Sequence, residues 1–152
     1  MITLLIAAAT LLAAFSARWY LHRSSRREES LLNGHICLTA LWNKGAAFAR
    51  PLSRWFVAAA SACALVFSWR KRKSAPLGAG LLLGGGLSNL YERLRHGKVY
   101  DYLRFPKAPG PIRNYVYNLA DFAILWQLCC LLFEIIRLRY CNRFSFEIDI
   151  RP

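Results

Sequence analysis

Two aspartates are the residues of this sequence whose surroundings could support chemistry. Asp121 lies about two turns into a long apolar run, and Asp101 follows an earlier apolar run in a stretch rich in basic residues. An aspartate near the centre of a membrane-spanning helix costs about 2.5–3.5 kcal/mol on insertion scales. Either a function or a hydrogen bond between helices could justify that cost for Asp121, and its position alone leaves both interpretations open.

The two aspartates together predict a more specific chemistry than either one alone. If the chain between Asp101 and Asp121 folds back on itself, the two carboxyl groups meet at one membrane surface. Two carboxylates that share a site cannot both ionise easily, so one of them keeps its proton. The ionised group can then activate a water as a general base while the other acts as a general acid, without a metal ion. Asn118 is three residues before Asp121 and therefore lies on the same helical face.

Other kinds of site find less support in the sequence. The histidines show no metal-ligand spacing with cysteines or acidic residues. The five cysteines are an odd number and three of them lie inside apolar runs, which argues against a disulfide scaffold. The three glycines at 84–86 have no Lys-Ser/Thr after them, so they indicate close helix packing rather than a phosphate loop. We therefore expect no metal ion and no cofactor.

The elements that position these residues follow from an unusual composition. The chain has 152 residues, 56% of them hydrophobic, and 21 Lys and Arg against 8 Asp and Glu give a net charge of +13. So many apolar residues exclude intrinsic disorder, and the clustering of charge between apolar runs argues against a nucleic-acid-binding domain. A bilayer core needs about 20 apolar residues in a helix. We predict an all-α polytopic membrane protein whose four transmembrane helices span about 2–20, 52–69, 75–92 and 115–137.

The connections between these spans are less well defined. Residues 35–48 suggest a strand pair or an irregular cap, and the prolines and glycine between 106 and 111 predict a turn-rich loop. With both termini in the cytoplasm, 8 basic residues would lie inside and 13 outside, which is opposite to the positive-inside rule. Only the dense basic cluster at 70–73 supports cytoplasmic termini. Charge alone therefore leaves the topology open.

Three sequence blocks resemble the motifs of the bacterial lipoprotein signal peptidases (signal peptidase II). Residues 43–48 read Asn-Lys-Gly-Ala-Ala-Phe, similar to N-x-G-A-A-F. Residues 84–93 read Gly-Gly-Gly-Leu-Ser-Asn-Leu-Tyr-Glu-Arg and residues 97–102 read Gly-Lys-Val-Tyr-Asp-Tyr, similar to G-G-A-x-G-N-x-x-D-R and G-x-V-x-D-F. Residues 117–124 read Tyr-Asn-Leu-Ala-Asp-Phe-Ala-Ile, similar to F-N-x-A-D-x-x-I. Order and spacing agree from 43 to 124, which makes the combination specific.

The resemblance implies an intramembrane aspartyl endopeptidase of the bacterial inner (cytoplasmic) membrane. It implies four transmembrane helices, a small extracytoplasmic β/loop cap and cytoplasmic termini, with one membrane-embedded peptidase domain over 1–140 and a cytoplasmic tail over 141–152. The implied reaction removes signal peptides from diacylglyceryl-modified prolipoproteins by cutting before the lipidated cysteine. The expected partners are these prolipoproteins and membrane lipids, with no nucleic acid, and we expect a monomer.

The resemblance also implies roles for individual residues. Asp101 and Asp121 match the catalytic pair, and four residues match substrate-binding positions: Asn43, Asn89, Arg93 and Asn118. This chain departs from the family pattern at Ser88, where the family has Gly, and at Glu92, where it has Asp. At the end of the first span the family's Asp-Gln-x-x-Lys is missing its acid, and Arg18 stands in for the lysine. The chain is thus similar to a divergent member or paralogue. The alternative is a non-catalytic relative that binds lipidated peptides or acts as a membrane scaffold.

Overall fold

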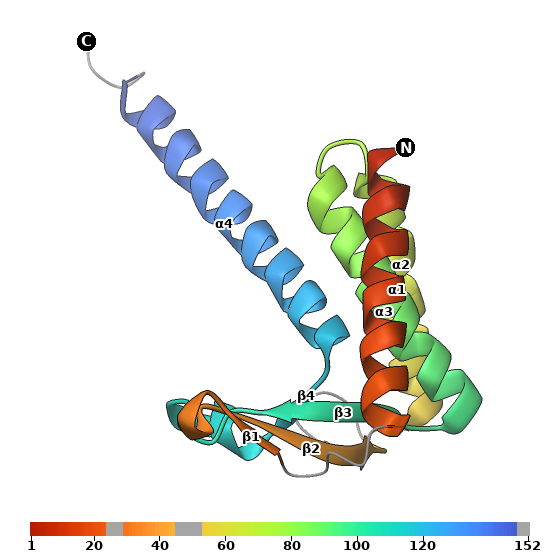
Figure 1. Ribbon diagram of the computed structural model, residues 1–152. Coiled ribbons are helices and arrows are strands. Elements are labelled where there is room, and N and C mark those ends of the chain that lie inside the picture. The colour runs from red at the N-terminus through yellow and green to blue at the C-terminus, as the bar shows by residue number, and fades with distance from the viewer. Residues whose placement is uncertain (24–28, 45–52, 149–152) are drawn as a thin grey trace.

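Helices make up most of the protein, and a small sheet lies across one end of them (Figure 1). The computed structural model describes residues 1–23, 29–44 and 53–148. The helices are α1 (Ile2–Arg23), α2 (Arg54–Lys71), α3 (Pro76–His96) and α4 (Leu119–Ile148), and two short 3-10 turns are η1 (Leu32–Gly34) and η3 (Gly110–Asn114). The strands are β1 (Glu29–Leu31), β2 (Ile36–Asn43), β3 (Val99–Arg104) and β4 (Val116–Tyr117). Four helices thus occupy the four segments predicted to be helical.

Helix α3 is the central helix, because each of the other three packs against it. Its glycines at 84, 85 and 86 face three different neighbours. An added Cβ would lie 2.5 Å from the Ala7 carbonyl oxygen of α1 at Gly84, 2.7 Å from the Ala120 carbonyl oxygen of α4 at Gly85, and 2.9 Å from Leu65 of α2 at Gly86. The absence of a side chain lets the helices approach closely, as small residues do in membrane bundles. The prediction of close helix packing at these glycines is confirmed.

We expect Gly84→Ala to lower the free energy of unfolding by about 1–3 kcal/mol, because its methyl group would press on the backbone of α1. Gly86→Ala is the matched control, two residues away in the same helix. There the methyl group meets the end of the Leu65 side chain, which can move, and the better helix propensity of Ala offsets the strain by about 1 kcal/mol. Thermal unfolding in detergent measures both, and equal losses would contradict this account of the packing.

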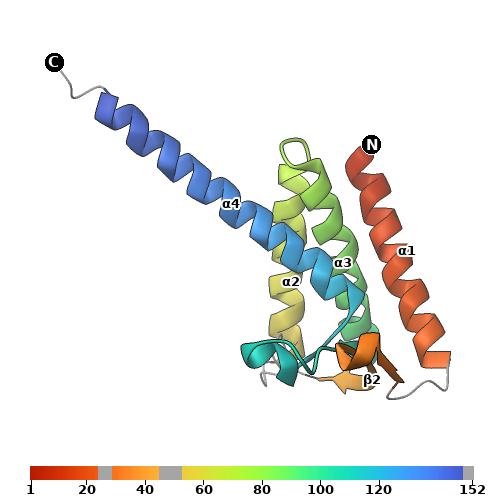
Figure 2. The ribbon, with the colours of Figure 1, turned by 60° about the vertical axis from the view of Figure 1, so that its left-hand side comes forward.

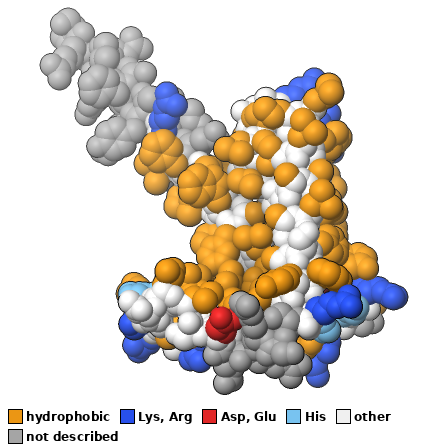
Figure 3. Space-filling model, in the orientation of Figure 1, with side chains coloured by type: hydrophobic (Ala, Val, Ile, Leu, Met, Phe, Trp, Pro, Cys, Tyr) orange, Lys and Arg blue, Asp and Glu red, His pale blue; other side chains and the backbone are white. Residues whose placement is uncertain are grey.

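Helices α1, α2 and α3 stand side by side, whereas α4 begins beside α3 and slants away from the other three (Figures 1 and 2). Large apolar side chains point outward along these helices, and polar ones such as Ser68, Asn89 and Gln127 are buried between them. Figure 3 shows apolar side chains over the visible face of the helices and most Lys and Arg side chains near their two ends. This arrangement inverts that of a water-soluble protein and suits helices surrounded by lipid.

Among the described residues, one helix is both long and apolar enough to cross a membrane by itself, namely α1. The apolar part of α4, Leu119–Phe133, is shorter. Helix α2 ends in Arg70 and Lys71, and the last two turns of α3 carry several charged residues, which lowers the hydropathy of both.

The sheet has the strand order β1-β2-β3-β4, and all its neighbours are antiparallel. Strand β2 lies within the segment 35–48 that suggested strands. The segment between the third and fourth helices was predicted to be a turn-rich loop. That prediction was incomplete, because the segment also contains β3 and β4. Residues 116 and 117 pair with β3 at Arg104 and Leu103, so the fourth helix begins at Leu119 rather than at 115, and it continues to Ile148.

Candidate active site

Asp101 is held on a buried strand. Val99 to Tyr102 of β3 are all buried, and Asp101 itself is 3% exposed. Strand β2 pairs with β3 and places Leu41 opposite Asp101, and a register shift between Leu38 and Leu41 puts an irregularity in β2 beside the acid. Such bulges re-aim side chains next to functional sites. Strand β4 reaches β3 only at Leu103 and Arg104, so the edge of β3 near Asp101 is left to side chains.

Asp121 lies in the first turn of α4, because Asn118 immediately precedes the helix. The sequence placed it about two turns into a span, and that prediction was wrong because residues 115–118 are extended. The Asp121 backbone N–H donates to Asn118 Oδ1 at 3.1 Å, and the Asn118 backbone N–H donates to Asp121 Oδ2 at 2.9 Å. This reciprocal pair is a capping box. It fixes the Asp121 carboxylate at the helix N-terminus, where the helix dipole favours negative charge.

Asn118 connects the two aspartates. Besides its bonds to Asp121, its Nδ2 donates to Asp101 Oδ1 at 2.8 Å. One buried residue therefore contacts both carboxyl groups, because its side-chain Nδ2 donates to Asp101 and its backbone N–H donates to the Asp121 carboxylate. Its side-chain oxygen accepts the Asp121 backbone N–H. The structure thus brings together three residues from β3 and the start of α4 that the sequence singled out.

The other three residues singled out by the sequence lie around this centre. Asn43, at the end of β2, donates from Nδ2 to Asp101 Oδ2 at 3.0 Å. Asn89 of α3 donates from Nδ2 to Asp121 Oδ1 at 2.9 Å. Arg93, one turn further along α3, has its Nη1 3.5 Å from the Asn89 carbonyl oxygen, and its charge acts on both carboxylates. Each acid therefore has an asparagine of its own, a shared asparagine and a nearby cation.

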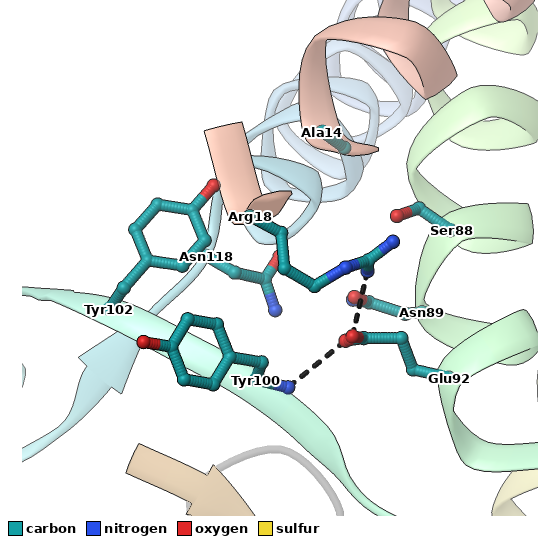
Figure 4. Close-up of a pocket in the computed structure, with 8 residues that line it drawn as sticks. All are labelled: Ala14, Arg18, Ser88, Asn89, Glu92, Tyr100, Tyr102 and Asn118. Atoms are coloured by element: carbon teal, nitrogen blue, oxygen red, sulfur yellow. Dashed lines mark hydrogen bonds and ion pairs between the residues drawn. The ribbon is translucent and has the colours of Figure 1, made fainter. Parts of the chain in front are cut away.

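A second layer lies behind these residues (Figure 4). Arg18 of α1 forms an ion pair with Glu92 of α3, with Nη1 and Oε1 2.8 Å apart. Glu92 Oε2 also accepts the backbone N–H of Tyr100 at 3.0 Å, and the Tyr102 hydroxyl accepts the Leu119 backbone N–H at 3.1 Å. A cavity of about 10 Å³ lies between the layers, with these lining residues: Ala14, Arg18, Ser88, Asn89, Glu92, Tyr100, Tyr102 and Asn118.

Burial raises the pKa of the Asp101 carboxyl from its ordinary 3.8 to about 7, and the charge of Asp121 raises it further in the same direction. The hydrogen bonds from Asn118 and Asn43 and the charge of Arg93 oppose the rise. Asp101 therefore holds a proton up to about neutral pH. Such a group can donate a proton at a pH where an ordinary aspartate cannot. Within residues 1–23, 29–44 and 53–148, no cluster of three or more His, Cys, Asp or Glu side chains is arranged to hold a metal ion.

Comparison with known proteins connects this geometry to a family. A family model described as signal peptidase (SPase) II matches residues 4–137 of the chain. The chain belongs to the signal peptidase II family. The lipoprotein signal peptidase of Syntrophomonas wolfei subsp. wolfei is 38% identical over 124 residues, which cover 76% of this chain and 78% of that protein. The lipoprotein signal peptidase of a Synechococcus species is 33% identical over 141 residues, covering 85% and 89%.

Solved structures agree with this chain in fold. Two structures of bacterial membrane enzymes match with TM-scores of 0.78 and 0.74, each at 17% sequence identity. They cover 89% and 88% of this chain, and 87% and 91% of their own chains. The family model and the relatives support a peptidase and confirm the resemblance that the three motif blocks indicated. The solved structures show that the chain has the fold of these membrane enzymes.

The sequence did not predict the contacts that Glu92 makes behind Asp101. Glu92 was noted only as a departure from the family pattern next to Arg93, yet it contacts Arg18 and the Tyr100 amide instead. A signal was present, since an arginine and a glutamate had each replaced a family residue of the same charge. Which side chains meet across two helices cannot be read from spacing within one helix.

Proposed function

We propose that this chain is an aspartyl endopeptidase that removes signal peptides from diacylglyceryl-modified prolipoproteins by cutting before the lipidated cysteine. The observation that carries the proposal is that one residue, Asn118, donates to both acids: its side-chain Nδ2 to Asp101 and its backbone N–H to the Asp121 carboxylate. Membership of the signal peptidase II family supports the substrate class, because its relatives are named lipoprotein signal peptidases. In this proposal Asn43, Asn89, Arg93 and Asn118 bind the substrate and orient the acids.

The proposed mechanism divides the acid and base roles between the two aspartates. Asp121 is partly exposed and accepts N–H bonds from Asn118 and Asn89 at a helix N-terminus, which stabilises its negative charge. It removes a proton from a water whose oxygen attacks the carbonyl carbon before the lipidated cysteine. Asp101 then donates its proton to the leaving nitrogen as the C–N bond breaks. The products are the carboxylate of the signal peptide and the free amine of the lipidated cysteine.

The proposed placement is multi-pass in the bacterial inner membrane, with all four helices crossing as one domain over 1–140. The outward-facing apolar side chains of the helices support it, as do the charged residues near their ends. The start of α1 and the end of α4 lie at the end of the molecule away from the sheet, and we place them in the cytoplasm together with a tail over 141–152 (Figure 1). The sheet at the other end would form an extracytoplasmic cap. Helices α1, α2 and α3 end in basic residues, and the side chains of these residues can reach the headgroup region of the membrane. We propose a monomer in contact with membrane lipids.

Cleavage by the purified protein in lipid vesicles tests the proposed reaction. The substrate is a diacylglyceryl-modified prolipoprotein, and the control is the same chain without the lipid. Mass spectrometry should find a product that begins at the lipidated cysteine, formed only from the modified substrate. Binding of the modified substrate without any product would favour the alternative, a non-catalytic relative that binds lipidated peptides.

We expect kcat/KM to fall above about pH 7, by up to tenfold per pH unit, because Asp101 then loses the proton that it must donate. Stability should change in the same range. The pKa of Asp101 is higher in the folded protein than the ordinary 3.8, so its stabilising effect is full below about pH 4 and disappears as the pH rises through 7. Rates and melting temperatures between pH 4 and 9 test both statements. A rate that is constant from pH 6 to 9 would contradict the role of Asp101 as the acid.

A further inference from the structure

The ion pair between Arg18 and Glu92 joins two helices directly behind the candidate site. Both side chains are well removed from solvent, at 15% and 3% exposure. Removing charged groups from water is expensive, and breaking a buried pair leaves one charge uncompensated. The Arg18 guanidinium also lies over the Phe15 ring at 4.3 Å, and Phe15 contacts Tyr91 of α3 edge-on at 5.4 Å. The position of the cation is therefore set from both helices.

Glu92 uses its second oxygen on the strand that carries Asp101. Its Oε1 contacts Arg18, and its Oε2 accepts the backbone N–H of Tyr100 at 3.0 Å. Among the described residues no strand pairs with β3 on that side at Tyr100, so the Glu92 carboxylate accepts the hydrogen bond in place of a neighbouring strand. A charged acceptor makes a stronger hydrogen bond than a backbone carbonyl does. This hydrogen bond lies one residue before Asp101 in the same strand. It therefore restricts where the backbone of β3 places the Asp101 side chain.

The side chain of Tyr100 is held as well. Its ring packs on Trp42 of β2, with centroids 5.1 Å apart, and on His22 of α1 at 5.5 Å. Tyr100 is thus fixed at its backbone by Glu92 and at its ring by the ends of β2 and α1. Ser88, Glu92 and Arg18 line the same cavity, and Figure 4 shows the Ser88 hydroxyl and the Glu92 carboxylate on either side of the Arg18 guanidinium. The three departures from the family pattern therefore meet at one place.

We propose that Arg18 and Glu92 are positioning residues for Asp101, acting together through the Tyr100 amide. The ion pair orients the Glu92 carboxylate, the carboxylate fixes the Tyr100 N–H, and the strand then holds Asp101 at the distance from Asn118 that the reaction needs. Neither residue touches the two aspartates in this arrangement, so their effect is on geometry and not on proton transfer itself. The proposal rests on the aspartyl peptidase function proposed above.

Kinetics of single and double variants in lipid test the proposal. Glu92→Gln and Arg18→Met should each lower kcat by about 10- to 100-fold, because small displacements of reacting groups have effects of that size. KM should stay within about twofold, because the proposed role of both residues is to position Asp101 and not to bind substrate. The double variant should be no slower than the slower single variant, because the two residues act as one unit. Arg18→Lys keeps the positive charge beside Glu92 and should stay within about threefold of the wild type.

A spectroscopic signal separates positioning from general loss of stability. The amide proton resonance of Tyr100 should move upfield in Glu92→Gln and Arg18→Met, because its bond to a charged acceptor weakens. Ser68→Ala is the control, since it removes a buried hydrogen bond between α2 and the Ala79 carbonyl of α3 without touching Tyr100. It should lower the melting temperature but leave kcat and the Tyr100 resonance unchanged.

Two results would overturn the positioning role. One is an unchanged kcat in variants whose Tyr100 resonance has moved. The other is a loss of kcat in Ser68→Ala as large as in the Arg18 and Glu92 variants at the same melting temperature. If the wild-type protein cleaves the lipidated substrate and the variants give either of these results, the positioning role alone is refuted. An inactive wild-type protein refutes the proposed function and this role with it.

Discussion

Asp101→Asn is expected to lower kcat by about 10²–10⁴-fold, with the fold intact. The substitution keeps the shape of the side chain but removes the proton that the leaving nitrogen needs, and positioned proton transfer contributes effects of this size. The amide also removes an ionisable group from a buried strand, so folding should become easier above neutral pH rather than harder. Single-turnover cleavage of the lipidated substrate gives the rate, and melting temperatures at pH 5 and 8 give the stability.

Asp121→Asn should give a loss of the same order, because the proposed reaction needs both the base and the acid. Glu29→Gln is the matched control, since it neutralises a carboxyl group on β1, which β2 separates from the strand that carries Asp101. It should leave kcat unchanged. Retention of wild-type cleavage by either aspartate variant would refute the two-aspartate site, whatever the effect on stability.

Asn118→Ala is expected to lower kcat by about 10²-fold and to affect KM much less. Asn118 is the residue that contacts both acids, and its removal frees the Asp101 carboxyl and the start of α4 together. Loss of an N-cap costs about 0.5–2 kcal/mol of stability, so the melting temperature should also fall. Steady-state kinetics and thermal unfolding in the same lipid mixture measure the two effects side by side.

Two further variants separate the roles of Asn118. Asn118→Ser retains a good capping side chain but is too short to reach Asp101, so it should restore stability without restoring kcat. Asn43→Ala removes an amide that donates to Asp101 alone, and its loss of kcat should be smaller. If Asn43→Ala and Asn118→Ala were equally slow, the link between the two acids would have no special importance. An effect of Asn118→Ala on KM only would contradict its place beside the acids.

Much of the fold and of the candidate site could be predicted from the sequence. Long apolar runs locate helices because the backbone must pair internally in lipid, and all four helices lie where such runs predicted them. Polar residues in an apolar chain are few, so those in the motif blocks were natural candidates. Asn43, Asn89 and Asn118 are now each within 3.0 Å of an aspartate oxygen.

The parts that could not be predicted depend on contacts between elements. The sequence of β3, Val-Tyr-Asp-Tyr-Leu-Arg, does not alternate between apolar and polar residues, because its first four residues are all buried and none had to be polar for solvent. The prolines that follow β3 suggested only a loop. The position of Asp121 was wrong because an apolar run does not show where a helix begins, and the capping box became visible only with the bonds between Asn118 and Asp121. The partnership of Arg18 with Glu92 joins residues 74 positions apart in the sequence, through the packing of α1 on α3.

The slanted course of α4 places Asp121 close to one end of the helix and leaves the other end far from the candidate site (Figure 1). The 30 residues of α4 extend over roughly 45 Å, and the capping box sits at the end nearest the sheet. A rotation of about 5° around that end moves the far end by roughly 4 Å but Asp121 by less than about 0.5 Å. A small rotation of α4 about its first turn would therefore displace the far end of the helix and leave Asp121 beside Asn118. The geometry of the two aspartates is thus insensitive to how the far end of α4 is placed.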